Sequence, residues 1–162
     1  MKKNLLARVL DSVFGMRAYA ARSVADDPLL SFKFRVTVPG LPTEIGFQKC
    51  TGLNFEVEVV EYDEGSWDFT HKLPGRGKVN EVVLERGSYA DTNFKDLVHE
   101  VLTNPNIRNT VTIEHLTRYG EVARTYKLAE CWASKWEAGD LDASSSDVAI
   151  ESITLQFEYF LE

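Results

Sequence analysis

Carboxylates are the most closely spaced reactive side chains in this sequence, and six of them fall between residues 56 and 68. Two carboxylates that face each other across a cleft could act as general acid and base, as in glycoside hydrolysis. Here the first members alternate with apolar residues, which is typical of the solvated face of a β-strand. The sequence therefore favours a strand surface over a catalytic pair for this set: Glu56, Glu58, Glu61, Asp63, Glu64 and Asp68.

The histidines and cysteines fit no ligand or catalytic spacing. His71, His99 and His115 lie far apart in the chain, and none belongs to an HExxH pattern. Cys50 and Cys131 lack the paired CxxC spacing of a zinc site and can form at most one bridge with each other. We favour two reduced, partly buried thiols, and the alternative is a disulfide within or between subunits.

Two further motifs suggest ligand binding only weakly. Gly75-Arg76-Gly77-Lys78 is similar to a phosphate-binding loop, but it lacks the glycine five residues earlier and the following Ser or Thr. Trp132 and Trp136 could stack on a sugar, yet paired tryptophans also serve as anchors of a core or an interface. We therefore predict no catalytic, metal or cofactor site, and we expect a protein that is not an enzyme.

The stretch from Phe55 to Gly87 organises the rest of the chain. Phe55, Val57 and Val59 alternate with glutamates, which predicts a half-buried strand, and Val79 to Arg86 predicts a second one. The loop predicted between them, Asp63 to Lys78, is far longer than the ~2–5 residues of an ordinary hairpin loop. Because long loops in compact domains are usually functional or disordered, we expect this one to contact a partner.

Length and charge limit the function classes. The chain has 162 residues, 44% of them hydrophobic, which suits one domain with a substantial core. Its formal charge of −7 disfavours sequence-specific DNA binding and attraction to anionic lipid. No run of about 20 apolar residues occurs, so we expect no membrane-spanning helix and no membrane partner.

Residues 1–27 differ in composition from the remainder, 28–162. They hold five basic and three acidic residues, a net charge of +2, which leaves −9 on the rest (−7 minus +2). Arg8, Asp11 and Arg17 interrupt what would be the apolar core of a secretory signal. The spacing of the apolar residues between Leu5 and Phe14 instead favours an amphipathic helical arm that docks on a neighbour or on its own domain, with a disordered tail as the alternative.

The remaining pattern is mostly that of β-strands. Strands are predicted at 31–38, 45–49, 110–117, 122–131 and 148–161, one helix at 91–103, and a loop at 132–146. This order predicts a mainly β fold, an antiparallel β-sandwich or barrel with one flanking α-helix. Since the last strand has nothing after it to cover its edge, we expect its pairing with another chain.

Several of these blocks, in this order, resemble the tail tube protein of contractile-tailed phages and its relatives in phage-tail-like contractile injection systems. The resemblance covers about residues 27–161, and its most specific part joins Lys72-Leu73-Pro74-Gly75-Arg76 to the strand end Arg86-Gly87. The other blocks are Asp27-Pro28 with Phe32 to Val36, Thr51-Gly52-Leu53, Val60-Glu61-Tyr62, Val83 to Glu85, Trp136-Glu137, Asp140-Leu141 and Val148 to Glu151.

The resemblance implies a structural virion protein without a cofactor. Six subunits would form a ring, rings would stack helically, and sheets of neighbours would join edge to edge into a continuous barrel around a channel. Implied partners are further copies of the chain, a sheath protein outside, a baseplate or initiator and a terminator at the ends, and a tape measure protein and then DNA in the lumen. The implied location is the virion tail, assembled in the host cytoplasm.

The resemblance also assigns candidate residues. In the family the long loop packs against the adjacent ring, so the candidates for ring and subunit contacts are Asp63, Glu64, Trp67, Phe69, His71, Lys72, Leu73, Pro74, Arg76 and Lys78. Candidates for the lumen or for polar faces are Glu56, Glu58, Glu81 and Glu85. A disulfide of Cys50 or Cys131 between subunits belongs to no pattern of the family.

Three alternatives stay open at this point. The chain could form the inner tube of a bacterial injection particle that carries protein cargo, or it could be a tube-initiator or baseplate paralogue with the same fold. A third class is a monomeric β-sandwich that binds or hydrolyses carbohydrate. The third alternative predicts a compact monomer with ligand binding, whereas the tube interpretation predicts polymers without turnover.

Overall fold

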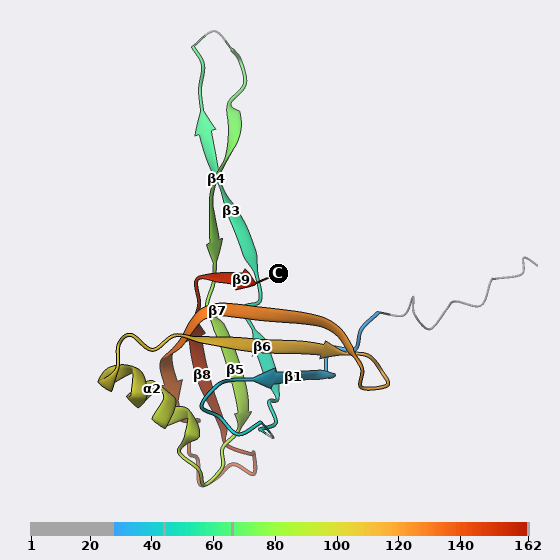
Figure 1. Ribbon diagram of the computed structural model, residues 1–162, viewed down its shortest axis with the longest axis vertical. Coiled ribbons are helices and arrows are strands. Elements are labelled where there is room, and N and C mark those ends of the chain that lie inside the picture. Colours follow the sequence, from blue (N-terminus) through green and yellow to red (C-terminus); the bar gives the residue numbers. More distant parts are fainter. Residues whose placement is uncertain (1–27, 44, 66, 162) are drawn as a thin grey trace, which may run out of the picture.

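The computed structural model describes residues 28–43, 45–65 and 67–161, so the predicted arm at 1–27 lies outside the described residues. The described chain is mainly β, with antiparallel pairing throughout and one described helix at the side (Figure 1). This confirms the predicted fold class. The strands are β1 (Phe34–Thr37), β2 (Lys49–Thr51), β3 (Phe55–Tyr62), β4 (His71–Val79), β5 (Val82–Gly87), β6 (Asn109–Leu116), β7 (Val122–Glu137), β8 (Ile150–Gln156) and β9 (Tyr159–Leu161), and the helix is α2 (Asn93–Thr103).

Seven strands form one sheet that folds over itself. The strand order is β1-β6-β7-β8-β5-β2, with β9 paired to β7. The first half of β7 pairs with β6 and β9, and its second half pairs with β8. In Figure 1 the strands β1, β6 and β7 cross over β5 and β8, which gives a sandwich of two half-sheets joined through β7.

A bulge in β7 makes this change of direction. Where Asn109 and Val111 of β6 face Cys131 and Leu128, the register shifts, and Glu130 has a positive φ of 53°. An extra residue in one strand bends that strand and increases its twist. β7 therefore runs on to Glu137 and serves both half-sheets, whereas the sequence predicted a loop from residue 132 onward.

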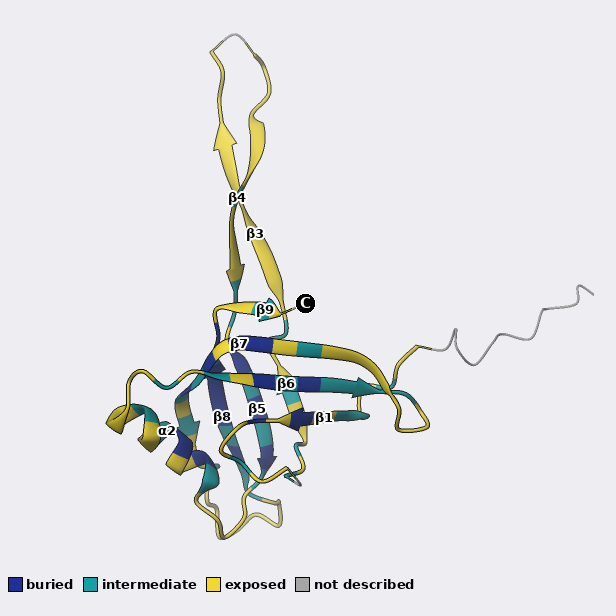
Figure 2. Cartoon of the chain, viewed as in Figure 1, coloured by how far each residue is buried: buried dark blue, intermediate teal, exposed yellow. Residues whose placement is uncertain are grey.

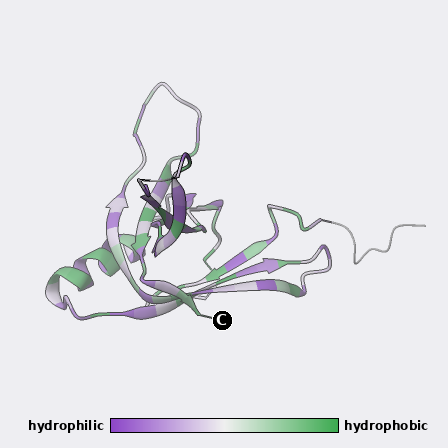
Figure 3. Ribbon diagram, turned by 90° about the horizontal axis from the view of Figure 1, so that it is seen from above, coloured by the Kyte–Doolittle hydropathy of each residue, from purple (hydrophilic) through white to green (hydrophobic). Residues whose placement is uncertain are grey.

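The core lies between the half-sheets and under α2. Alternation along β5 directs Val82 and Leu84 inward, and both are fully buried (Figure 2). α2 is amphipathic, as its mixed colours in Figure 3 show, and it buries Phe94 and Leu97. The helix begins after Thr92, ends before Asn104, and confirms the predicted helix to within two residues.

Several predicted strand boundaries were wrong. The strand predicted at 45–49 starts at Lys49, and the long final strand is interrupted after Gln156 before β9 begins. The larger error concerns the partner of β3. Of the second strand predicted at Val79 to Arg86, only Val79 pairs with β3, as the last residue of β4. Val82 to Arg86 belongs to β5, which lies between β2 and β8 in the main sheet.

Candidate functional site

The partner of β3 is β4, and the two strands form a separate hairpin that projects from the body (Figure 1). Half of the predicted long loop, Asp63 to Lys78, is therefore strand, and only residues 63–70 connect the two strands. Leu73-Pro74-Gly75, predicted as part of this loop, lies within β4. Glycine and proline in this segment favoured a loop because both are depleted in strand interiors.

A bulge in β4 accommodates these residues. Val57 pairs with Gly77 and Val59 pairs with Pro74, so Gly75 and Arg76 together face one residue, Glu58. A Cβ atom on Gly75 would come within 2.9 Å of the Glu58 carbonyl oxygen. β4 therefore needs glycine at position 75 for the strands to approach each other.

The hairpin has two faces of different composition. Directly paired residues of antiparallel strands share a face, so the register places Phe55, Val57, Val59, Pro74 and Val79 together on what we call the Phe55 face. The opposite face carries Glu56 and Glu58 near the body, followed by these residues toward the tip: Val60, Leu73, Tyr62 and His71.

Every residue of β3 is exposed, although the sequence predicted a half-buried strand (Figure 2). Val59 is 58% exposed and Leu73 is 51% exposed. An isolated two-stranded hairpin is at best marginally stable in water, and large exposed apolar patches mark interaction sites. The alternation of β3 was predicted correctly, but within the described residues no other element covers either face of this strand.

Charge pairs reinforce the hairpin along its length. Lys72 lies 3.7 Å from Glu61 and Lys78 lies 3.9 Å from Glu56, each pair directly across the two strands. All four side chains are well exposed, so each pair contributes about 0–1 kcal/mol and mainly helps to fix the register.

The tip of the hairpin gathers aromatic rings. The ring of His71 stacks at 6.1 Å from Trp67 and at 6.4 Å from Tyr62, and its Nε2 atom lies 3.6 Å from Glu64 Oε2. The backbone N–H of Trp67 donates to the carbonyl of Glu64 at 2.9 Å. Phe69 is 73% exposed, which leaves an aromatic group at the end of the projection.

The predicted contact candidates all lie on this hairpin. Four lie in the tip, Asp63, Glu64, Trp67 and Phe69, and six lie on β4, His71, Lys72, Leu73, Pro74, Arg76 and Lys78. Their role in contacts between subunits stays a prediction.

The four predicted lumen residues do not form one group. Glu56 and Glu58 belong to the hairpin, whereas Glu81 and Glu85 belong to the body. Glu81 accepts a hydrogen bond from Gln156 at 2.9 Å, and Glu85 forms an ion pair with Lys49 at 2.8 Å. Glu81 and Glu85 lie on the polar outer face of the half-sheet that contains β5.

The two cysteines are free thiols. Cys131 is buried in the core, and burial raises the pKa of its thiol to about 12. Cys50 is half-buried, and burial raises its pKa to about 11. Since the thiolate is the reactive form, both groups react slowly at neutral pH.

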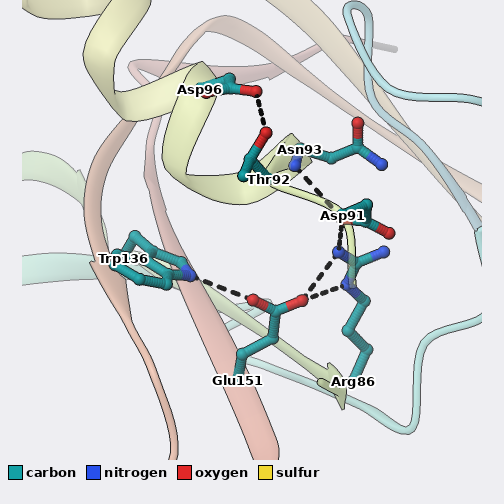
Figure 4. Close-up of polar contacts among 7 residues, drawn as sticks. All are labelled: Arg86, Asp91, Thr92, Asn93, Asp96, Trp136 and Glu151. Atoms are coloured by element: carbon teal, nitrogen blue, oxygen red, sulfur yellow. Dashed lines mark hydrogen bonds and ion pairs between the residues drawn. The ribbon is translucent and has the colours of Figure 1, made fainter. Parts of the chain in front are cut away.

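A buried ionic cluster, which the sequence analysis did not identify, connects the helix to the sheet (Figure 4). Arg86 is 2% exposed and lies 2.7 Å from Glu151 Oε1 and 2.5 Å from Asp91 Oδ1. Its guanidinium also lies 4.2 Å from the centroid of Phe94, while Trp136 donates to Glu151 at 3.1 Å. The alternation along β5 contains a signal that the prediction of this strand did not use, because it places Arg86 on the inward face with Val82 and Leu84.

The described residues do not form a site for metal chemistry. Within residues 28–43, 45–65 and 67–161, three or more His, Cys, Asp or Glu side chains nowhere gather as a metal site would require. Among the same residues, no helix has the length and hydrophobicity needed to cross a membrane.

Comparison with known families agrees with this architecture. Residues 30–161 match the family described as T4-like virus tail tube protein gp19. The chain belongs to this tail tube family. The match covers the hairpin, α2 and the whole sheet, and it confirms the resemblance on which the tube interpretation depended. The tail tube family is one of structural proteins.

Solved structures share the fold. A chain in the PVC sheath-tube complex of an extracellular contractile injection system matches with a TM-score of 0.75 and 23% identity, covering 85% of this chain and 93% of that one. A chain in the anti-feeding prophage baseplate matches with a TM-score of 0.72 and 26% identity, and the match covers 83% of this chain and 95% of that one. A chain in the PVC sheath/tube terminator matches with a TM-score of 0.75 and 24% identity, and the match covers 84% of this chain and 96% of that one. No curated protein matched the chain.

Proposed function

We propose that this chain is the subunit of a tail tube in which six copies form a ring and rings stack helically. The observation that carries the proposal is the exposed β3–β4 hairpin, whose apolar residues have no partner surface within the described chain. Fully burying one Val, Leu or Phe side chain is worth roughly 1.5–3 kcal/mol. Association that covers several of them therefore provides a strong driving force for assembly.

The hairpin contacts adjacent rings, while the sheets of neighbours in one ring join edge to edge around the channel. β1 and β2 end the strand order of the main sheet, so their outer edges are free for such pairing in the described subunit. Membership of the tail tube family supports this arrangement.

The partners follow from the same proposal. A sheath protein surrounds the tube, a baseplate or initiator and a terminator close its ends, and a tape measure protein and then DNA occupy the lumen. The 26% identity to a chain of the anti-feeding prophage baseplate supports a place in such a particle. The subunit works as a structural part of the virion tail after assembly in the host cytoplasm, and it catalyses no reaction.

Negative charge prevents the channel wall from retaining DNA. Six copies carry about −42 formal charges per ring (6 × −7), and like charges repel. We propose that Glu56, Glu58, Glu81 and Glu85 contribute to the wall or to polar ring contacts.

A second candidate is the tube of a contractile injection system that delivers protein. The similarity to the anti-feeding prophage chain favours it. The contents of purified native particles discriminate between the two candidates, since a phage tail delivers DNA and an injection particle holds protein cargo.

Replacing the aromatic side chains at the hairpin tip tests the proposal. Trp67→Ser with Phe69→Ser removes contacts between rings, so we expect short or absent tubes in negative-stain electron microscopy. Because both side chains are largely exposed, the unfolding free energy of the subunit should change by less than about 0.5 kcal/mol each. Leu102→Ser on α2, where the side chain is 74% exposed, is the matched control that keeps normal tubes. Tubes of normal length from the double variant would contradict the proposal.

A further inference from the structure

The inward faces of β1, β6 and β7 are covered along only part of their length. In β7, Leu128 is buried, Tyr126 two residues earlier is half-buried, and Arg124 is exposed. β1 and β6 show the same loss of burial toward the same end (Figure 2). Within the described residues, the core face of this half-sheet therefore continues past the core as an open surface.

This open surface forms a groove with β2 as its second wall. We call it the end groove, and its apolar lining consists of Phe32, Phe34, Cys50, Leu53, Ile113 and Tyr126. Four of these side chains, those of Phe34, Cys50, Leu53 and Tyr126, pack against the core while remaining partly exposed. Phe32 at the rim is 69% exposed. A contiguous apolar surface of this kind is typical of an interaction site.

The described chain begins beside the end groove. The backbone N–H of Leu116 donates to the Lys33 carbonyl at 2.8 Å, and His115 Nε2 lies 3.0 Å from the Leu30 carbonyl oxygen. These contacts hold residues 30–33 against the end of β6. Residues 1–27 therefore join the body only a few positions away from the groove.

We propose that residues 5–14 of the same chain pack their apolar side chains in the end groove. The spacing in this segment predicts an amphipathic helix, in which a polar face with Asn4, Arg8, Asp11 and Ser12 lies opposite an apolar one. The apolar face carries Leu5, Leu6, Val9, Leu10, Val13 and Phe14. Amphipathic helices bind apolar grooves through side chains spaced one turn apart.

The length of the connecting segment allows this return. Residues 15–27 span up to about 45 Å when extended, which is sufficient to lead back from Pro28 to the groove. A tethered segment has an effective concentration in the millimolar range, which favours it over a free partner. The match to the tail tube family begins at residue 30, so residues 5–14 lie outside the matched region. Their docking takes place in the unassembled subunit and does not depend on tube formation.

Cross-linking in the full chain tests this contact directly. We would combine Val9→Cys with Arg124→Cys in a Cys50→Ser background and treat the dilute, unassembled subunit with a short bismaleimide. The matched control replaces Arg124→Cys with Thr125→Cys, because both positions are exposed but point to opposite faces of β7. Cys131 is buried in the core, so its reaction is slow. We expect at least about tenfold more linkage within one chain at position 124, measured by mass spectrometry of the monomer band.

Native Cys50 provides a second measurement without introduced thiols. Docked residues 5–14 shield this side chain, so Val9→Ser should raise its rate of alkylation by about tenfold. Losing the burial of one Val side chain shifts a docking equilibrium by about that factor. Arg8→Ser, on the polar face of the predicted helix, is the matched control and should leave the rate unchanged.

Two results would overturn the inference. The first is equal linkage at positions 124 and 125 together with equal alkylation rates of Cys50 in the Val9→Ser and Arg8→Ser variants. The second is a link to position 124 that occurs only in dimers, which would assign the end groove to residues 5–14 of a second copy.

Discussion

At the scale of single residues, Arg86 determines how α2 joins the sheet. It connects Glu151 of β8 with Asp91 before the helix, and its guanidinium faces the ring of Phe94 within the helix. A buried charge is costly unless it is paired and hydrogen-bonded. Here both carboxylates and an aromatic face provide those contacts.

Replacing Arg86 with Met should destabilise the subunit by about 3–5 kcal/mol, because Glu151 would remain buried without its cation. Urea unfolding of the unassembled subunit measures this effect. Lys135→Met is the control, since its ion pair with Glu137 is exposed and contributes at most about 1 kcal/mol. Similar small losses for both variants would contradict the assigned role of Arg86.

Asp91 makes part of this stability depend on pH. Its hydrogen bond with Arg86 holds the pKa of its carboxyl below the usual value, as does the backbone N–H of Asn93. A lowered pKa in the folded state stabilises the protein above the unfolded value of about 3.9, and this contribution is lost as the pH falls through the folded value. Asp91→Asn should therefore cost stability at pH 7 but little at pH 2–3, measured by urea unfolding. A difference that stays constant with pH would contradict the assignment.

The sequence contained the pattern of this cluster without its geometry. Alternation places Arg86 with Leu84, and Glu151 with Ile153, on inward faces of their strands. A charged residue at an inward position indicates a buried partner. Which acid it meets depends on the pairing of β5 with β8, and short-range periodicity does not give strand order.

At the scale of elements, the hairpin is where sequence and structure differ most. The alternation of Phe55, Val57 and Val59 predicted β3 correctly. Pro74 and Gly75, in contrast, led to the prediction of a loop where the structure has β4. The bulge opposite Glu58 admits both residues, and a bulge leaves no periodic signal. The helix was predictable because its apolar spacing and its stop at Asn104-Pro105 are local features.

Gly75→Ala should distort the hairpin without unfolding the body. The new Cβ would lie 2.9 Å from the Glu58 carbonyl oxygen, which forces the strands apart. We expect reduced assembly in sedimentation experiments and an almost unchanged urea midpoint. Gly65→Ala is the matched control, because nothing lies within 4 Å of its added Cβ. Equal assembly of the two variants would show that the bulge geometry is not needed for contacts.

At the scale of the whole molecule, the subunit combines a body that has its own hydrophobic core with a projecting hairpin, which we propose is buried by other copies. The body has a continuous core between its two half-sheets and under α2, whereas the hairpin is exposed along all of β3. The sequence predicted the fold class and the family, because both depend on patterns spread along 132 matched residues (30–161). It could not predict the strand order β1-β6-β7-β8-β5-β2, because periodicity along the chain does not show which strands pair.

The central claim is that this chain polymerises into a hollow tube. Negative-stain electron microscopy of the purified protein at rising concentration, alone and with preformed baseplates, tests it most directly. We predict hollow rings or tubes, at the latest once a baseplate supplies the template. A protein that remains monomeric at high concentration with baseplates present would contradict the account.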